Sequence, residues 1–75
     1  MNDKEIQMHL KAGEAYGRGS TCGNKIKYGH EETAVKAAEK LTITYSKPLE
    51  AYPCFFCQEW HIGRKMTEEE RVKFS

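Results

Sequence analysis

The clearest periodic pattern of hydrophobic and polar positions lies in residues 31–42. Ala34, Ala38 and Leu41 recur at i, i+4 and i+7, the spacing that places side chains on one face of a helix. Glutamates open this segment and lysines follow them, an order that suits the helix dipole. The pattern predicts the main helix of the fold, with alanines that allow close packing on a sheet, continuing to about Ser46.

Shorter helices are predicted towards the two ends of the chain. Residues 3–12 have an amphipathic pattern that begins at Asp3 as the capping residue and ends at Gly13, because glycine weakens a helix by about 1 kcal/mol. The glycine-rich residues 13–23 predict a loop. Residues 67–70 read Thr-Glu-Glu-Glu, a capping-box pattern that predicts the start of a short C-terminal helix.

Three short segments predict strands, namely residues 24–29, 49–53 and 58–63. In the first of them, Ile26 and Tyr28 fall on one side and two lysines fall on the other, as in a half-buried strand. Runs of strands and helices that do not alternate regularly favour the α+β class. We therefore expect a short three-stranded sheet packed on one main helix, with short terminal helices.

The composition bounds the class of protein. With 75 residues, the chain is long enough for one domain, and a chain of this length buries only about 60% of its unfolded surface. Its net charge of +1 differs from the strongly basic composition that is typical of nucleic-acid-binding domains. No apolar run approaches the roughly 20 residues of a membrane helix, and the first residues lack the apolar core of a signal peptide. We expect a cytoplasmic protein without membrane association.

The most specific motif places Cys54, Cys57 and His61 at the spacing C-x2-C-x3-H. Thiolate sulfur and imidazole nitrogen are the ligands that tetrahedral Zn²⁺ prefers, and a structural zinc site uses four of them. Cys22 is the only other cysteine, so we expect it to be the fourth ligand. An odd number of cysteines is also atypical of a secreted disulfide scaffold. The sequence therefore predicts one Zn²⁺ as the cofactor of the domain.

The metal site divides the single domain, residues 1–75, into three parts. Residues 1–20 form an N-terminal helix and a glycine-rich loop, residues 21–63 form the zinc core, and residues 64–75 form the C-terminal helix. Small scaffolds of this size usually need a staple such as a metal ion. We expect the zinc core to supply that staple.

Two alternatives remain open at the metal. His9 and His30 compete with the spare cysteine for the fourth position. Zinc deaminases carry H-x-E followed by P-C-x-x-C, and His30, Glu32, Cys54 and Cys57 follow the same order. This match defines a remote catalytic alternative, in which a glutamate moves protons at an open zinc position. A chain of 75 residues is too short for the larger sheet around such a site, so we expect no enzymatic activity.

The run from Cys22 to Gly63 resembles small zinc-ribbon-like proteins of phages and bacterial genomes. The shared pattern is a cysteine, a basic-aromatic strand, a helix with spaced alanines, and then Y-x-C-x-x-C-x-x-W-H-x-G. The family often has glycine after the second cysteine of the knuckle, where this chain has Gln58, and that position often takes a positive φ. The resemblance implies bound zinc and a phage or prophage origin, and it implies no settled activity.

Two functions follow from these observations. The first is a non-enzymatic binding module that acts by binding a host protein in the bacterial cytoplasm, without a small-molecule substrate. The alternative is a zinc finger that binds DNA or RNA through basic and aromatic side chains. The residues that would carry this binding are Lys25, Lys27, Tyr28, Trp60, Arg64 and Lys65.

Overall fold

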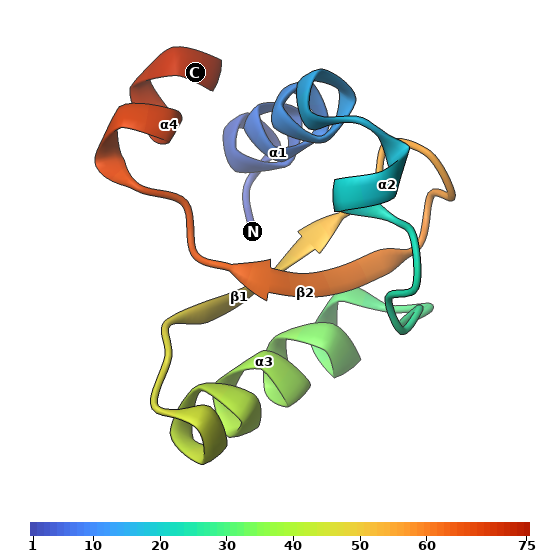
Figure 1. Ribbon diagram of the computed structural model, residues 1–75, viewed down its shortest axis with the longest axis vertical. Helices are drawn as coiled ribbons and strands as arrows, with labels where there is room; N and C mark the ends of the chain where they lie inside the picture. The colour runs from blue at the N-terminus through green and yellow to red at the C-terminus, as the bar shows by residue number, and fades with distance from the viewer.

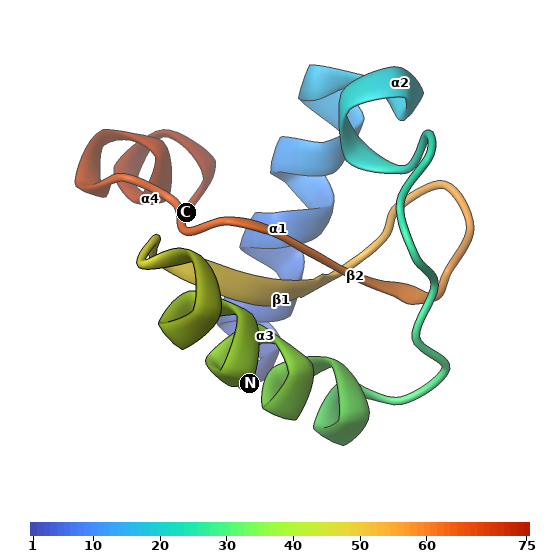
Figure 2. The same ribbon diagram turned by 60° about the horizontal axis from the view of Figure 1, so that its bottom comes forward.

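A computed structural model describes all of residues 1–75, with four helices and a two-stranded antiparallel sheet. In chain order the elements are α1 (Asp3–Tyr16), α2 (Arg18–Thr21), α3 (Glu31–Tyr45), β1 (Leu49–Pro53), β2 (Trp60–Arg64) and α4 (Glu68–Phe74). The sheet lies in the middle, with α3 on one face and with α1 and α4 on the other (Figure 1). Figure 2 shows α2 at the end of α1, on the same side of the molecule as the loop that joins β1 to β2. The expected α+β class is confirmed.

The helix α3 is the main helix that the hydrophobic pattern predicts. Ala34 and Ala38 are 0% and 3% exposed, and they pack against Ala51 of β1. Their short side chains let the helix approach the sheet closely, and half-buried Tyr28, Trp60 and Ile62 complete this cluster. The helix ends at Tyr45, close to the predicted end near Ser46. Ser46 follows as the cap residue, with a left-handed backbone of φ 54° and ψ 38°.

The third strand predicted at residues 24–29 is not confirmed. This segment forms a single β-bridge, in which Tyr28 and Trp60 exchange two backbone hydrogen bonds of 2.8 Å. Ile26 is 72% exposed, although the alternating pattern placed it on a half-buried face. The backbone carbonyl of Ile26 accepts a hydrogen bond of 2.8 Å from the ring of His61, and not from the backbone N–H of a neighbouring strand. The observed sheet therefore consists of β1 and β2 alone.

The loop predicted at residues 13–23 is largely wrong, because α1 continues through Gly13 to Tyr16 and α2 follows it. Gly13 is buried where α1 meets α2. A Cβ at Gly13 would lie 3.1 Å from the Cγ2 atom of Thr21, so glycine permits a close approach here. The Thr21 hydroxyl also donates a hydrogen bond of 3.2 Å to the Gly13 carbonyl, which holds the two helices together.

Both terminal helices have side-chain caps. Asn2, rather than the predicted Asp3, caps α1 by accepting a hydrogen bond of 2.8 Å from the backbone N–H of Glu5. The capping box predicted at the C-terminal helix is confirmed, with Thr67 and Glu70 each accepting from the backbone N–H of the other.

Glu70 also connects three elements of the fold. Its carboxylate accepts two hydrogen bonds from the Arg64 guanidinium of β2, at 2.9 and 3.1 Å, and one from the Tyr16 hydroxyl of α1 at 2.5 Å. The guanidinium, together with the Thr67 N–H and the Tyr16 hydroxyl, holds the pKa of this carboxyl well below its usual range. This network joins α4 to the rest of the molecule by polar contacts.

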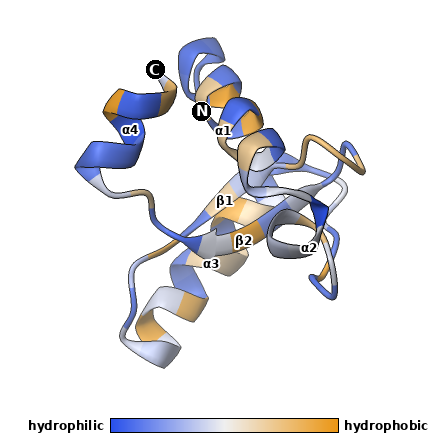
Figure 3. Cartoon of the chain, turned by 45° about the horizontal axis from the view of Figure 1, so that its top comes forward, coloured by the Kyte–Doolittle hydropathy of each residue, from blue (hydrophilic) through white to orange (hydrophobic).

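The apolar core of the molecule is small and lies in two parts. On the face of the sheet opposite α3, Met8 and Ala12 of α1 pack against Phe74 of α4. Only 11 of the 75 residues are buried. The helix α4 contributes little to this core, because it is hydrophilic over most of its length (Figure 3). Two clusters of three buried residues give limited hydrophobic stabilisation, so a further constraint on the fold is expected. None of the helices is both long and apolar enough to cross a membrane.

Candidate metal centre

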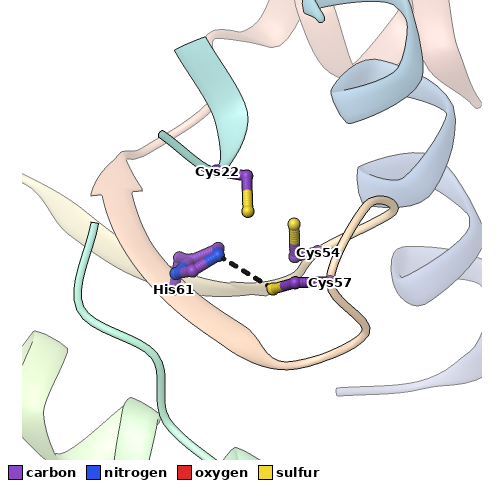
Figure 4. A group of neighbouring side chains, drawn as sticks. All are labelled: Cys22, Cys54, Cys57 and His61. Carbon is purple, nitrogen blue, oxygen red and sulfur yellow. Dashed lines mark hydrogen bonds between the residues drawn. The ribbon is translucent and has the colours of Figure 1, made fainter. Parts of the chain in front are cut away.

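The turn between β1 and β2 positions Cys54 and Cys57, which are two of the four metal ligands that the sequence predicts. Cys54 follows β1 directly, and its backbone N–H donates to the carbonyl of Glu59 at 2.8 Å. Gln58 donates back to the carbonyl of Cys54 at 3.1 Å and has a φ of 64°, the left-handed conformation expected at the position where the resembling family has glycine. This tight turn places Cys54 and Cys57 side by side at one end of the sheet (Figure 4).

His61 comes from β2, where it pairs with Tyr52 of β1, and it is 0% exposed. Its Nδ1 atom lies 2.8 Å from the carbonyl oxygen of Ile26. A carbonyl only accepts hydrogen bonds, so Nδ1 carries the hydrogen and Nε2 is left with a free lone pair. Nε2 lies 3.3 Å from the Sγ atom of Cys57, on the side of the cluster. A histidine held by a backbone carbonyl in this way is oriented for metal binding.

Cys22 reaches the turn from the opposite side, as the residue that ends α2. Its backbone N–H donates to the carbonyl of Arg18 at 2.8 Å, which fixes it to the short helix. The Tyr52 hydroxyl donates to the carbonyl of Thr21, the preceding residue, at 2.6 Å. This hydrogen bond connects β1 to α2 and brings Cys22 over the other three side chains (Figure 4).

The ligand atoms of Cys22, Cys54, Cys57 and His61 all lie within 4.8 Å of one another. Zinc–sulfur bonds measure about 2.3 Å, so two sulfur ligands of one tetrahedral ion lie about 3.8 Å apart. A small inward movement of the side chains would let one ion contact all four. The four residues are therefore positioned to bind a metal ion, and three sulfurs with one imidazole are a donor set that suits zinc.

The environment affects two of the thiols in opposite directions. Burial, together with contacts to Cys57 and Cys54, raises the pKa of the Cys22 thiol to about 11. Burial also disfavours the thiolate of Cys54, but hydrogen bonds from the backbone N–H groups of Cys57 and Phe56 outweigh it and lower the pKa of Cys54. A metal ion binds the thiolate form of cysteine, so its binding would have to displace the proton of Cys22.

The two competing histidines lie outside this cluster. His30 is exposed and precedes α3 as its N-terminal cap residue, and Glu32 forms an exposed ion pair with Lys36 at 3.6 Å. His9 is buried in α1, where its ring stacks on Tyr52 at 6.2 Å between ring centroids. Cys22, rather than either histidine, completes the group of four ligands.

The residues predicted for nucleic-acid binding are less free than their sequence suggests. Tyr28 and Trp60 are half-buried and pack against the alanine cluster under α3. The guanidinium of Arg64 is bound by Glu70. Exposed Lys27 and Lys65 and half-buried Lys25 form no ion pair, so they are the cations of this set without a carboxylate partner.

Sequence reasoning missed the groups that support the ligands. The Ile26 carbonyl orients His61, but every residue has a backbone carbonyl, so no sequence signal marks this one. Tyr52 was noted only as part of a motif, whereas its hydroxyl ties Thr21 to the sheet. A tyrosine two residues before the first cysteine of the turn is the one signal that pointed towards this contact.

Comparison of the chain with protein-family models, with curated proteins and with solved structures returned no match. The cluster of four ligand side chains suggests a zinc-binding site, but the resemblance to zinc-ribbon-like proteins is not confirmed. From sequence and geometry together, the chain is a small α+β protein whose Cys22, Cys54, Cys57 and His61 are placed to bind one metal ion.

Proposed function

We propose that the protein is a non-enzymatic binding module held together by one structural Zn²⁺ ion. The observation that carries this proposal is the closed set of three cysteines and one histidine, with ligand atoms within 4.8 Å of one another. Four protein ligands leave no position for a substrate or a reacting water, which is the arrangement of structural rather than catalytic zinc. The ion would join the end of α2, the turn and β2, which the two small apolar clusters do not connect.

The deaminase alternative gains little support from the arrangement of its residues. It requires His30 beside Cys54 and Cys57, with Glu32 facing an open zinc position. His30 is instead the exposed cap residue before α3, and Glu32 lies in the first turn of that helix with its side chain 81% exposed. His61 and Cys22 take the two positions that a catalytic site would give to His30 and to a water.

Zinc binding is expected at one ion per chain. Native mass spectrometry of the purified protein should detect a single zinc, which a strong chelator removes together with the folded charge-state distribution. The same chelator saturated beforehand with Zn²⁺ serves as the control and should leave both unchanged. A folded, monodisperse protein without any metal would contradict the proposal.

The partner we propose is a host protein, bound in the bacterial cytoplasm by a phage- or prophage-encoded module. The phage assignment rests on the resemblance of the run from Cys22 to Gly63 to small zinc-ribbon-like proteins. A protein partner is favoured by the net charge of +1, which differs from the strongly basic composition typical of nucleic-acid-binding domains.

Nucleic-acid binding is the competing outcome, and we expect it to be weak. Fluorescence anisotropy with duplex DNA, single-stranded DNA and RNA should show no saturable binding that weakens steeply with salt, because few phosphates would be neutralised. Lys25→Gln together with Lys27→Gln should leave the signal unchanged. Tight binding with a steep salt dependence, lost in that double variant, would favour the nucleic-acid alternative instead.

A further inference from the structure

A cavity of about 400 Å³ lies between α1, α2 and β2, next to the metal cluster. Its volume is at the lower end of the roughly 300–1,000 Å³ that is usual for small-molecule sites. Residues from both terminal helices, from α2 and from both strands line it, so it is formed only by the complete fold. None of the four metal ligands lines the cavity, which makes it separate from the metal centre.

The cavity wall includes a buried polar side chain without a partner in the protein. His9 is 5% exposed, and its Nε2 atom is buried and makes no hydrogen bond. The nearest carboxylate oxygen, on Glu50, is 3.9 Å away and already accepts from the backbone N–H of Met66. Burying an unpaired polar atom destabilises a fold, so this atom calls for an explanation such as a partner that occupies the cavity.

The charged groups of the lining favour an anionic ligand. Arg64 and Tyr16 are both engaged by the carboxylate of Glu70, which is thereby neutralised. Lys25 also lines the cavity, is half-buried and forms no ion pair, so its ammonium group is the cation free to meet a ligand. Ser20 also lines the cavity.

The remaining lining is apolar and partly aromatic. The ring of Tyr52 lies beneath Gly63, where a Cβ would approach the Tyr52 Cε1 atom to 3.1 Å, so the strand has no side chain above this ring. Ala12 and Met66 form the adjacent wall. A ligand that fits this lining has an apolar or aromatic body beside the ring and one anionic group near the lysine.

We propose that this cavity binds a small organic carboxylate, with the carboxylate on Lys25 and an apolar body against Tyr52 and Met66. This inference goes beyond the structural metal site, because it assigns a ligand to a part of the molecule that contains none of the metal ligands. It also revises the expectation that no small molecule binds.

The test uses zinc-loaded, ¹⁵N-labelled protein and the matched pair phenylacetate and phenylacetamide, which differ in charge and little in shape. Titration with phenylacetate should give saturable shifts at the backbone amides of Gly13, Ser20 and Gly63. Phenylacetamide should bind at least about tenfold more weakly, which corresponds to about 1.4 kcal/mol. Lys25→Gln should weaken phenylacetate binding by a similar factor, while Lys27→Gln, on an exposed lysine outside the cavity, should not.

Three outcomes would overturn the proposal. They are an absence of saturable shifts with phenylacetate, equal responses to the acid and the amide, and shifts that gather away from the cavity. The comparison of acid with amide uses the unaltered protein, so it decides the question even if Lys25→Gln folds poorly. Detection of zinc in the same sample keeps this result separate from a failure of the metal site.

Discussion

Replacement of Cys54 by Ser is expected to unfold the protein rather than to inactivate a folded one. Cys54 is 1% exposed, lies at the start of the turn, and belongs to the group of four side chains that can hold one metal ion. Structural zinc contributes roughly 10–16 kcal/mol of binding free energy in zinc-finger peptides. A whole domain is stable by only about 5–15 kcal/mol. Loss of most of the zinc term therefore exceeds what two clusters of three buried residues can supply.

Circular dichroism during heating is the direct measurement of this effect. Cys54→Ser should show little helix signal and no cooperative transition, whereas the parent protein should melt cooperatively. Phe55→Ser is the matched control, because Phe55 is the next residue in the same turn, is 42% exposed and offers no ligand atom. A cooperative transition of Cys54→Ser close to that of Phe55→Ser would show that the fold does not depend on the metal.

The local elements that the sequence predicted well are those with a strong periodic or capping signal. The alanine spacing of α3 and the capping box at Thr67 depend on neighbouring residues only, and the structure confirms both. The continuation of α1 through Gly13 could not be predicted in the same way. It depends on contact with Thr21, which is eight residues away, and the intrinsic cost of glycine in a helix pointed the other way.

The strand predicted at residues 24–29 was wrong for a related reason. Its alternating pattern is real, but strand pairing is decided by the partner, and here β2 pairs with this segment only between Tyr28 and Trp60. The Ile26 carbonyl binds the ring of His61 instead of a neighbouring strand. The carbonyl that orients His61 is thus taken out of strand pairing. This contact joins residues 35 apart in the chain, so it can be recognised only once the fold is known.

The candidate site was predictable to a greater extent than the fold. The spacing of Cys54, Cys57 and His61 already indicated three ligands from one turn and its returning strand. Cys22 was expected as the fourth ligand because it is the one remaining cysteine, but His9 and His30 stayed in competition with it, since the choice depends on how α2 packs. The structure places Cys22 there through the hydrogen bond between Tyr52 and the residue before Cys22.

The two zinc arrangements give opposite results for one pair of variants. With a structural site, Cys22→Ser removes a ligand and should weaken zinc binding by more than about 100-fold, above the 10–100-fold typical of residues that only support a ligand. His30→Ala should leave zinc affinity unchanged, since His30 is exposed at the start of α3. With a deaminase-like site the order reverses, because His30 would then bind the metal and Cys22 would not.

Competition with a colorimetric zinc chelator measures the zinc affinities of Cys22→Ser and His30→Ala under the same conditions. Glu32→Gln is the control variant. Glu32 forms only an exposed i, i+4 ion pair with Lys36, so its replacement should change stability by no more than about 0.5 kcal/mol and should leave zinc binding intact. A deaminase-like site would use this glutamate to move protons, but it would not use it as a ligand. Zinc retained in Cys22→Ser and lost in His30→Ala would therefore make the catalytic alternative the leading one, whatever Glu32→Gln shows. We expect the reverse order, because the imidazole of His61 and the three sulfurs already supply the four ligands that one ion needs.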